Sequence, residues 1–496
     1  MARILYSTFC NVPGKNVFNG PFHEGLVKSL SKHGNKVFIM VTNDFLVNPY
    51  QSGELLLNIK TKKLNNYIKE VVKPDIIFTF NNSLYDGLLK ILDCPIALWC
   101  ADSPPTHSNK SLVKENIYRY HLLHFSESTI GSAKQIYGDD VKNSVIGYAS
   151  DFQREELVKD YSISFIGSYF GNDNHFKYLL ENSSPKEIDC IKDIVKRFEQ
   201  DPIGDFDKLF NKKNHFLKNK LSHLGLMQIF SNQKRLELFF ALKDMGLKIY
   251  GNRWWYEITS VFPDIFKVFD PKPIFSVKDN QDIYNKSKVC LNISHVQSDV
   301  DNMPFRVCDI MASDGVLLSD YKTIYSKLFG KDLKIPMYEN QFEAREMSRK
   351  LLQDEKWRRE IVFLCNKKIQ EKFRFEHRLR DLEQIFGINF ISKNNKEIKY
   401  KFIDAIDFVF VKKSSLLVNR SDIQNMNHNI VVSWMKLLLK YTLPKSLKKN
   451  IIELLHPKFV LYVKNIKPPS LFNKKTKTNF DNFLYKKMLS IVKRSK

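Results

Sequence analysis

The chain has 496 residues, of which 43% are hydrophobic and 13% aromatic, so it can build ordinary cores and is not a disordered chain. Its length predicts two or three domains. The formal net charge of +24 predicts affinity for polyanions, namely nucleic acid, an anionic membrane or an acidic glycan, and residues 391–496 alone hold 23 Lys and Arg against 6 Asp and Glu.

Cysteine usage and hydropathy predict where the protein resides. The seven cysteines include no Cys-x-x-Cys pair, and most lie in apolar stretches, which is typical of buried free thiols in a reducing cytosol. The N-terminus enters a strand without the apolar region of a signal peptide. No run of about 18 apolar residues is present, so we expect a cytoplasmic protein without a membrane-spanning helix.

The first 150 residues read as an alternation of strands and helices. A strand at 3–9, a glycine-containing loop, a helix at 22–33 and a strand at 36–42 form the opening of a Rossmann-like domain. The loop lacks G-x-G-x-x-G and so gives no dinucleotide signature. The later elements predicted here are helices at 55–72 and 84–92 and strands at 76–80, 95–100, 122–126 and 144–146.

Asp102 directly follows the strand at 95–100, and Pro104 and Pro105 stiffen the loop after it. Ligands of open α/β sheets bind beyond the carboxyl ends of strands. Asp102 and His107 are therefore candidate functional residues. The alternative is that Asp102 only caps the next turn.

A second domain is predicted from a strand at 160–168, a polar helical region at 169–232, a helix at 235–245 and a strand at 247–250. Gly251 then permits close backbone approach, and Arg253 could bind a phosphate. Trp254 or Trp255 could stack on a base, although a core position accounts equally well for one of them.

Residues 288–328 are the most informative stretch. A buried strand at 289–293 precedes a polar loop at 294–302, a short helix opened by Pro304, and a second strand at 316–318. Gly315 offers a permissive backbone for leaving the helix. Two acidic groups, Asp301 and Asp309, would flank the helix N-terminus, where carboxylates can bind vicinal hydroxyls and Arg306 can pair with a phosphate.

The sequence DNMPFRVCDIMASDGVLLSDY at 301–321 resembles the signature of the CgeB-like, group 1 retaining glycosyltransferases of the GT-B fold. Those proteins carry two glutamates with seven residues between them. The resemblance places Asp301 at the first, which contacts the donor sugar, and Asp309 at the second, which holds the nucleotide ribose. Both positions are Asp here, one methylene shorter.

Further stretches support the same resemblance. DYSISFIGS at 160–168 is similar to the strand that opens the second domain, where Gly167 and Ser168 would offer backbone N–H groups to the phosphates. FRFEHR at 373–378 is similar to the start of a last helix that crosses back to the first domain. The donor site implied by the resemblance also includes Gly251, Arg253, His295 and Asn302.

The resemblance implies an α/β chain with two Rossmann-like domains facing a cleft. Residues 1–155 would bind the acceptor and 156–390 the nucleotide sugar, with a helical insertion at about 170–232 and a basic, mainly helical extension at 391–496. The implied reaction is retaining glycosyl transfer to a glycan, lipid-linked or protein acceptor in bacterial surface polysaccharide or glycoconjugate synthesis. Asp301, Asp102 and Arg306 would be catalytic, with no metal and no cofactor besides the donor.

The basic extension leaves two interpretations open. Residues 430–443 are amphipathic, with Lys436, Lys440 and Trp434, and could lie peripherally on the anionic inner face of a membrane. Alternatively, they form a helical appendage with a solvated Lys face. A catalytically decayed GT-B scaffold that binds polyanions or membranes is the alternative function, since Asp replaces Glu twice. Nucleic acid is disfavoured as a partner, because no nucleic-acid-binding motif is present.

Overall fold

The computed structural model describes residues 1–409 except 10–17, 19, 49–51, 103, 171–176, 178–179, 203–205, 215–216, 218–222, 253, 273, 275, 297–301 and 393–395. The chain divides into two compact units, residues 1–408 and 409–496. The described residues end at 409, so the amphipathic segment at 430–443 lies outside them. In the described part of the chain, no helix is long and apolar enough to cross a membrane.

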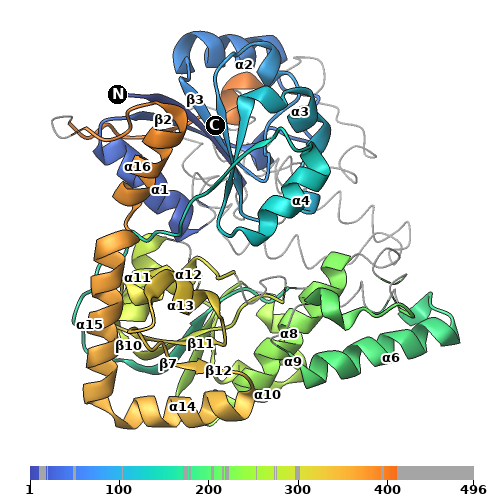
Figure 1. Cartoon of the computed structure of the whole chain (residues 1–496), viewed down its shortest axis with the longest axis vertical. Coiled ribbons are helices and arrows are strands. Elements are labelled where there is room, and N and C mark those ends of the chain that lie inside the picture. The colour runs from blue at the N-terminus through green and yellow to red at the C-terminus, as the bar shows by residue number, and fades with distance from the viewer. Residues whose placement is uncertain are drawn as a thin grey trace, which may run out of the picture. The chain divides into compact units, whose positions relative to one another are not determined.

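The first sheet has seven strands in the order β13-β2-β1-β3-β4-β5-β6, and every neighbouring pair is parallel. Its strands are β1 (Arg3–Thr8), β2 (Lys36–Val41), β3 (Ile76–Phe80), β4 (Ile96–Cys100), β5 (Tyr120–His124), β6 (Lys142–Val145) and β13 (Lys401–Phe402). The helices between them are α1 (Pro21–Lys32), α2 (Thr61–Tyr67), α3 (Lys110–Glu115) and α4 (Ser128–Tyr137). Figure 1 shows β1–β6 and α1–α4 in blue to cyan, whereas β13 comes late in the chain and has the orange of residues near 400.

One helix predicted in this region is wrong. Between β3 and β4 only a short 3-10 turn forms, Leu88–Lys90. The chain leaves β3 through Asn81 and Asn82, both of which have positive φ, a conformation that ends regular structure. The Asn82 side chain then donates to the carbonyl oxygens of Ser108 and Asn109, which holds this segment as a packed loop.

The second sheet has six strands in the order β12-β11-β10-β7-β8-β9, again all parallel. They are β7 (Tyr161–Ile166), β8 (Leu247–Tyr250), β9 (Phe269–Asp270), β10 (Ser287–Asn292), β11 (Val316–Asp320) and β12 (Met337–Tyr338). The helices of this part are α6 (Pro185–Gln200), α8 (His223–Leu242), α9 (Trp255–Val261), α10 (Pro263–Phe266), α11 (Val277–Asn285), α12 (Arg306–Met311), α13 (Ile324–Phe329) and α14 (Gln341–Gln353).

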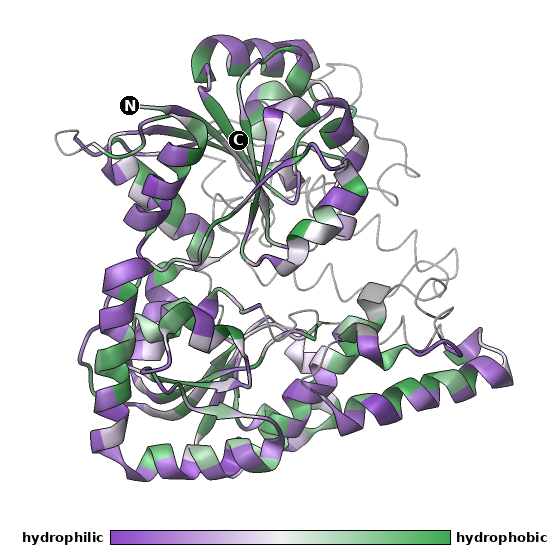
Figure 2. Ribbon diagram, viewed as in Figure 1, coloured by the Kyte–Doolittle hydropathy of each residue, from purple (hydrophilic) through white to green (hydrophobic). Residues whose placement is uncertain are grey.

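Strand composition explains this architecture. Helices cover both faces of a parallel sheet, so its strands are apolar without alternation. β3, β4 and β11 are buried at every residue, and Figure 2 shows the strands as largely hydrophobic. Two parallel sheets with flanking helices are the architecture predicted from the GT-B resemblance, and the fold-class prediction is confirmed.

After the second sheet, residues 355–402 lead the chain back to the first sheet. Helices α15 (Glu355–Lys372) and α16 (Phe375–Phe386) follow α14, and α16 packs on α1. The ring of Phe375 leaves no room for a side chain at Gly25 of α1, and Lys32 pairs with Glu376 at 3.4 Å. β13, which lies in the segment that the sequence assigns to the start of the extension, then pairs with β2.

The region between β7 and β8 contains, among its described residues, only helices and turns. The Ser184 hydroxyl and the Glu187 carboxylate cap α6 reciprocally, as in a capping box. One face of α6 is buried through Cys190, Ile191, Ile194 and Phe198. These side chains and the α8 residues Leu226, Met227 and Phe230 form a core separate from that of the two sheets, and Val296 of the polar loop also belongs to it.

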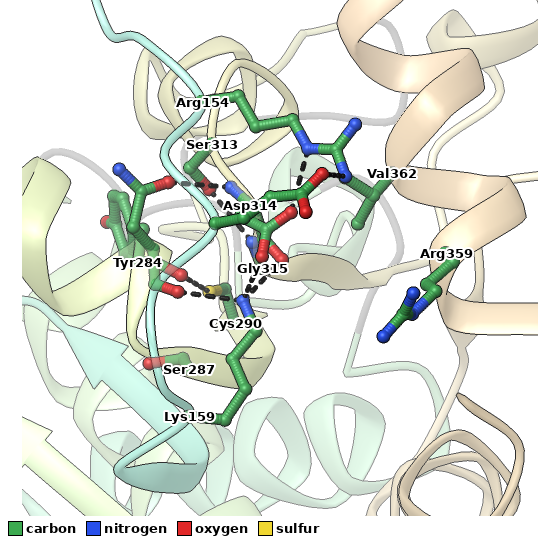
Figure 3. A network of polar contacts seen from close by, with 12 residues as sticks. Arg154, Lys159, Tyr284, Ser287, Cys290, Ser313, Asp314, Gly315, Arg359 and Val362 are labelled. Atoms are coloured by element: carbon green, nitrogen blue, oxygen red, sulfur yellow. Dashed lines mark hydrogen bonds and ion pairs between the residues drawn. The ribbon is translucent and has the colours of Figure 1, made fainter. Parts of the chain in front are cut away.

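Residues 146–160 join the two sheets, and ion pairs hold this joining segment in place (Figure 3). The Asp314 carboxylate, between α12 and β11, binds Arg154 Nε at 2.8 Å and Lys159 Nζ at 2.5 Å. Gly315 beside it lacks a positive φ, so the predicted need for a permissive backbone is wrong. Its requirement is steric, because a Cβ there would lie 2.3 Å from Cys290 Sγ.

The carboxyl edges of the two sheets meet through aromatic rings. Phe22, in the first turn of α1, stacks on Phe305, with ring centroids 4.4 Å apart. Phe125, which follows β5, packs edge-on against Phe305 at 4.7 Å. Phe305 directly precedes α12, so the residues after the strands of one sheet lie close to the start of this helix in the other.

Candidate functional site

Loops from β7, β8 and β10 converge at the carboxyl edge of the second sheet. The β7 loop is held by two asparagine side chains. Asn252 exchanges two hydrogen bonds with the backbone of Tyr169, at 3.1 and 3.0 Å, and Asn232 does the same with Phe170, at 3.1 and 2.8 Å. The described start of this loop, residues 167–170, is therefore fastened to the β8 loop and to α8.

Two glycines let these loops pack closely. A Cβ on Gly251 would lie 2.1 Å from the carbonyl oxygen of Gly167 and 2.7 Å from Trp255 Nε1. Gly167 donates its N–H to the Tyr250 carbonyl at 2.9 Å, so that N–H is already engaged, contrary to the predicted contact with a phosphate. The Ser168 carbonyl accepts a hydrogen bond from the Arg235 guanidinium. Gly167 and Gly251 thus shape the wall of the site.

Two arginines lie against Phe165, the next-to-last residue of β7. The guanidinium carbons of Arg235, from α8, and Arg306, from α12, lie 5.7 and 5.5 Å from its ring centroid. Arg235 is only 1% exposed, and burial together with the charge of Arg306 lowers its pKa to about 9. Within the described residues, Arg235 Nε and Arg306 Nη1 are buried without a hydrogen-bond partner. Two unpaired buried nitrogens on cationic groups are suited to bind an anion.

His295 is close to the same cations. Its ring packs edge-on against the ring of Phe170, with centroids 5.0 Å apart. The guanidinium carbon of Arg235 lies 4.4 Å from the centroid of the same Phe170 ring. Burial, followed by the charges of Arg235, Lys234 and Arg306, lowers the pKa of His295 to about 3. The imidazole is therefore neutral at pH 7 and can donate or accept a hydrogen bond without adding charge.

A buried ion pair supports this cationic cluster of Lys234, Arg235 and Arg306. Lys234 Nζ binds the Asp320 carboxylate at 2.6 Å, and Asp320 is fully buried at the end of β11. Burial alone would raise the pKa of Asp320, but the charges of Lys234 and Lys322 and its hydrogen bonds lower it overall. The Ser294 hydroxyl also donates to Asp320, at 2.9 Å, which fixes the start of the polar loop.

Helix α12 carries Arg306 and Asp309, but it has only six residues. A helix this short has a weak dipole, so the positive character of the site comes from the guanidinium groups. The sequence-based prediction that the helix N-terminus supplies it is therefore wrong. Asp309 is 6% exposed, and burial raises its pKa to about 7. Its Oδ1 accepts a hydrogen bond from Ser150 Oγ at 2.6 Å.

Other predicted donor-site residues have mixed outcomes. Asn302 accepts a hydrogen bond from the Tyr148 hydroxyl and so joins the polar loop to the first part of the chain. Asp301 and Arg253 lie outside the described residues. Trp255 is fully buried, with Nε1 donating to Gly167 O at 2.9 Å, whereas Trp254 is 48% exposed. The core position expected for one of the two tryptophans therefore belongs to Trp255.

Asp102 lies at the carboxyl edge of the first sheet, as predicted. Its Oδ2 accepts a hydrogen bond from Asn81 Nδ2 at 2.7 Å, and its N–H donates to Asn81 Oδ1 at 3.0 Å. The side chain is exposed, yet the surrounding protein desolvates it enough to raise its pKa. His107 is buried between the Tyr137 hydroxyl at 3.0 Å and the Asp102 carbonyl at 3.3 Å, so both of its ring nitrogens have partners within the protein.

No pattern in the sequence pointed to His23 as a functional residue. It lies in the first turn of α1, with Nδ1 2.8 Å from the Tyr6 hydroxyl and its ring 4.2 Å from that of Phe80. Burial lowers the pKa of His23 to about 4, so it is neutral at pH 7. Because Asn81 follows Phe80 and holds Asp102, His23 and Asp102 belong to the same edge. Arg235, Lys234 and Asp320 were also missed, since each lies in an ordinary helix or strand pattern.

Two other possible sites add little. Among the described residues, no three His, Cys, Asp or Glu side chains gather closely enough to hold a metal ion. A cavity of about 560 Å³ lies at the amino ends of β1, β3 and β4, lined by Met1, Pro74, Asp75, Pro95 and Ile388. That edge is opposite to the one carrying Asp102.

Two parallel sheets with flanking helices define an α/β protein, and the cationic cluster lies at the carboxyl edge of its second sheet. Residues 234–384 match a protein family described as "Glycosyl transferase-like". The matched segment is thus glycosyltransferase-like, and it contains the whole cationic cluster together with Asp309 and Asp320. No curated protein matches the chain.

Solved structures give distant similarities. The sucrose-phosphate synthase of Thermosynechococcus elongatus is 10% identical, with a TM-score of 0.45, over 77% of this chain and 98% of that chain. AviGT4, a glycosyltransferase of avilamycin A biosynthesis, is 10% identical, with a TM-score of 0.44, over 79% and 98%. The β-glucosyltransferase of phage T4 is 13% identical, with a TM-score of 0.42, over 78% and 99%. At these TM-scores the similarities carry no conclusion about activity.

Proposed function

We propose that the protein is a glycosyltransferase that takes its sugar from a nucleoside-diphosphate donor. The observation that carries this proposal is the pair of guanidinium groups on Phe165, each with a buried nitrogen that has no partner among the described residues. A leaving diphosphate develops negative charge in glycosyl transfer, and fixed cations in a desolvated site stabilise it. The glycosyltransferase-like segment at 234–384 contains both Arg235 and Arg306.

The residues would divide the work as follows. Arg235 and Arg306 bind the diphosphate, and the buried Lys234–Asp320 ion pair holds α8 against the end of β11 beside them. Asp309 accepts hydrogen bonds from the ribose hydroxyls, and Asp301 orients the sugar, as the CgeB-like resemblance implies. On the first sheet, Asp102 accepts the hydrogen bond of an acceptor hydroxyl. Its raised pKa makes it a stronger base than an ordinary carboxylate.

The finer features of the function follow from the resemblance and the charge. We propose a retaining, metal-independent transfer to a glycan, lipid-linked or protein acceptor of bacterial surface polysaccharide or glycoconjugate synthesis. The basic extension, residues 391–496, would bring the cytoplasmic enzyme to the anionic inner face of the membrane. Removing residues 410–496 should then reduce binding to vesicles with anionic lipid while leaving nucleotide binding intact.

Thermal unfolding of the protein with UDP, GDP, ADP or CMP tests the proposal, followed by the sugar conjugates of any nucleotide that binds. A ligand that binds only the folded state raises the unfolding temperature. A shift with one nucleoside diphosphate and not with CMP is the expected result. If no nucleotide shifts the transition, the alternative of a decayed scaffold that binds polyanions is favoured, since Asp replaces Glu at positions 301 and 309.

A further inference from the structure

We propose that Ser150, in the segment joining the two sheets, is a positioning residue that holds the Asp309 carboxylate in place for the donor. This inference rests on the proposed function. Ser150 Oγ lies 2.6 Å from Asp309 Oδ1, and the two side chains are 1% and 6% exposed. Neither residue type nor spacing in the sequence links these positions, which are 159 residues apart.

Hydrogen bonds hold both the backbone and the side chain of Ser150. Its N–H donates to the Phe373 carbonyl at 2.9 Å, and its own carbonyl accepts from Arg374 Nη1 at 3.2 Å. Its Oγ accepts the N–H of Phe152 at 3.1 Å. A hydroxyl carries a single proton, and with the Phe152 N–H already occupying an acceptor direction, that proton points to Asp309.

The pairing determines which protonation state of Asp309 is favoured. Burial raises the pKa of Asp309 to about 7, and the hydrogen bond from Ser150 counters this rise. The charges facing Asp309 come from Arg306 on α12, Arg374 before α16 and Asp151 of the joining segment, and the Tyr284 hydroxyl approaches from α11. The ionised carboxylate accepts hydrogen bonds from ribose hydroxyls more strongly than the neutral acid, which carries an O–H donor on one oxygen. Loss of Ser150 therefore disfavours the form of Asp309 that binds the nucleotide better.

The first test is nucleotide affinity as a function of pH, measured by calorimetry between pH 5.5 and 9 with UDP, GDP, ADP and CDP. Wild-type affinity should fall as the pH drops through about 7, when Asp309 becomes protonated. In Ser150→Ala the midpoint of this fall should move up by about one pH unit, since one hydrogen bond to the charged form is lost. An unchanged midpoint in Ser150→Ala would overturn the inference.

Ser348→Ala is the matched control. Ser348 in α14 is fully buried, and its hydroxyl has no partner among the described residues, so its removal should leave the midpoint unchanged. Should Ser150→Ala not fold, Asp309→Asn replaces it. That variant has no proton to lose at position 309, so its affinity should keep only the pH dependence that the terminal phosphate of the nucleotide gives, with a pKa of about 6. A wild-type pH profile in Asp309→Asn contradicts the inference.

A second measurement needs no ligand. The folded pKa of Asp309 is raised above its unfolded value, so its contribution to stability is full below about pH 4 and is lost as the pH rises through 7. Ser150 limits this loss, so Ser150→Ala should raise the unfolding equilibrium constant about tenfold more at pH 9 than at pH 5. If the wild type binds no nucleotide, the proposed function fails. The unfolding comparison then decides the Ser150–Asp309 pairing alone, and equal effects at both pH values overturn it.

Discussion

Arg235 and Arg306 share one aromatic ring. Their guanidinium carbons lie 5.7 and 5.5 Å from the centroid of Phe165, although the two residues come from different helices. Like charges held so close repel each other, and the charge of Arg306 contributes to the lowered pKa of Arg235. A bound diphosphate would replace this repulsion with attraction. The unliganded protein thus holds a destabilising arrangement that a doubly charged anion relieves.

Replacing Arg306 by Met tests this arrangement. The variant should bind the preferred nucleoside diphosphate about 100-fold more weakly, because truncation of one member of a desolvated charge contact costs several kcal/mol. Its unliganded stability should be equal to or higher than that of the wild type, since the repulsion with Arg235 is removed and Met fills similar space. Calorimetry gives the affinity, and urea unfolding gives the stability.

Arg345→Met is the control for that variant. Arg345 lies in α14 and pairs with Asp244 at 2.6 Å on the surface. Removing this exposed pair should change stability little, because solvent screens it, and should leave nucleotide affinity unaltered. Equal losses of affinity in Arg306→Met and Arg345→Met would show that only net charge matters, and would remove Arg306 from the site.

Patterns local in sequence predicted the fold well. The strand at 76–80 and the one at 247–250 have the bounds expected from their apolar runs. The helix predicted at 84–92 failed because Asn82 binds backbone carbonyl groups after residue 107, a contact that no local pattern reveals. The same limit applies to the site. Asp102 and Arg306 each lie two residues from a proline at the end of a predicted strand or the start of a predicted helix, so the sequence could identify them. Arg235 became notable only when folding brought it to Phe165.

Asp102→Asn separates chemistry from donor binding. Asn81 holds Asp102 through both its side chain and its N–H, so an amide of the same shape should keep the local structure. The amide cannot accept a proton, and transfer to an acceptor should slow by about 100-fold to 10,000-fold. Affinity for the nucleoside diphosphate should stay within about twofold, because Asp102 lies on the other sheet. Transfer at the wild-type rate would exclude Asp102 from the reaction.

Stability should fall in mild acid. Burial lowers the pKa of His23, His107 and His121 to about 4, and that of His295 to about 3. In the unfolded chain these groups bind protons below about pH 6.5, whereas the folded protein keeps them neutral. The stability they contribute is therefore complete above pH 6.5 and is lost as the pH falls toward 4. Asp309, with its raised pKa, acts in the opposite direction but is one group against four.

Urea unfolding at pH 7.5 and pH 5 measures the balance of these groups. We expect a loss of about 3–5 kcal/mol at pH 5. At about 1.4 kcal/mol per pKa unit, each buried histidine contributes about 2 kcal/mol and the partly exposed His121 less, and Asp309 offsets about 3 kcal/mol. His107→Gln, which keeps an acceptor and a donor near Tyr137, should reduce the loss by about 1–2 kcal/mol. Equal or greater stability at pH 5 would contradict the neutral state of these histidines.

Two glycines should respond to alanine in opposite ways. At Gly251 the added Cβ would lie 2.1 Å from the carbonyl oxygen of Gly167, a backbone atom that cannot turn aside. We expect Gly251→Ala to reduce the free energy of unfolding by about 1–3 kcal/mol and to weaken nucleotide binding, because the β7 loop must move. Gly131 lies inside α4 with open space at its Cβ, so Gly131→Ala should stabilise the protein by about 0.5–1 kcal/mol. Equal effects of the two substitutions would show that the contact between the β7 and β8 loops is not needed.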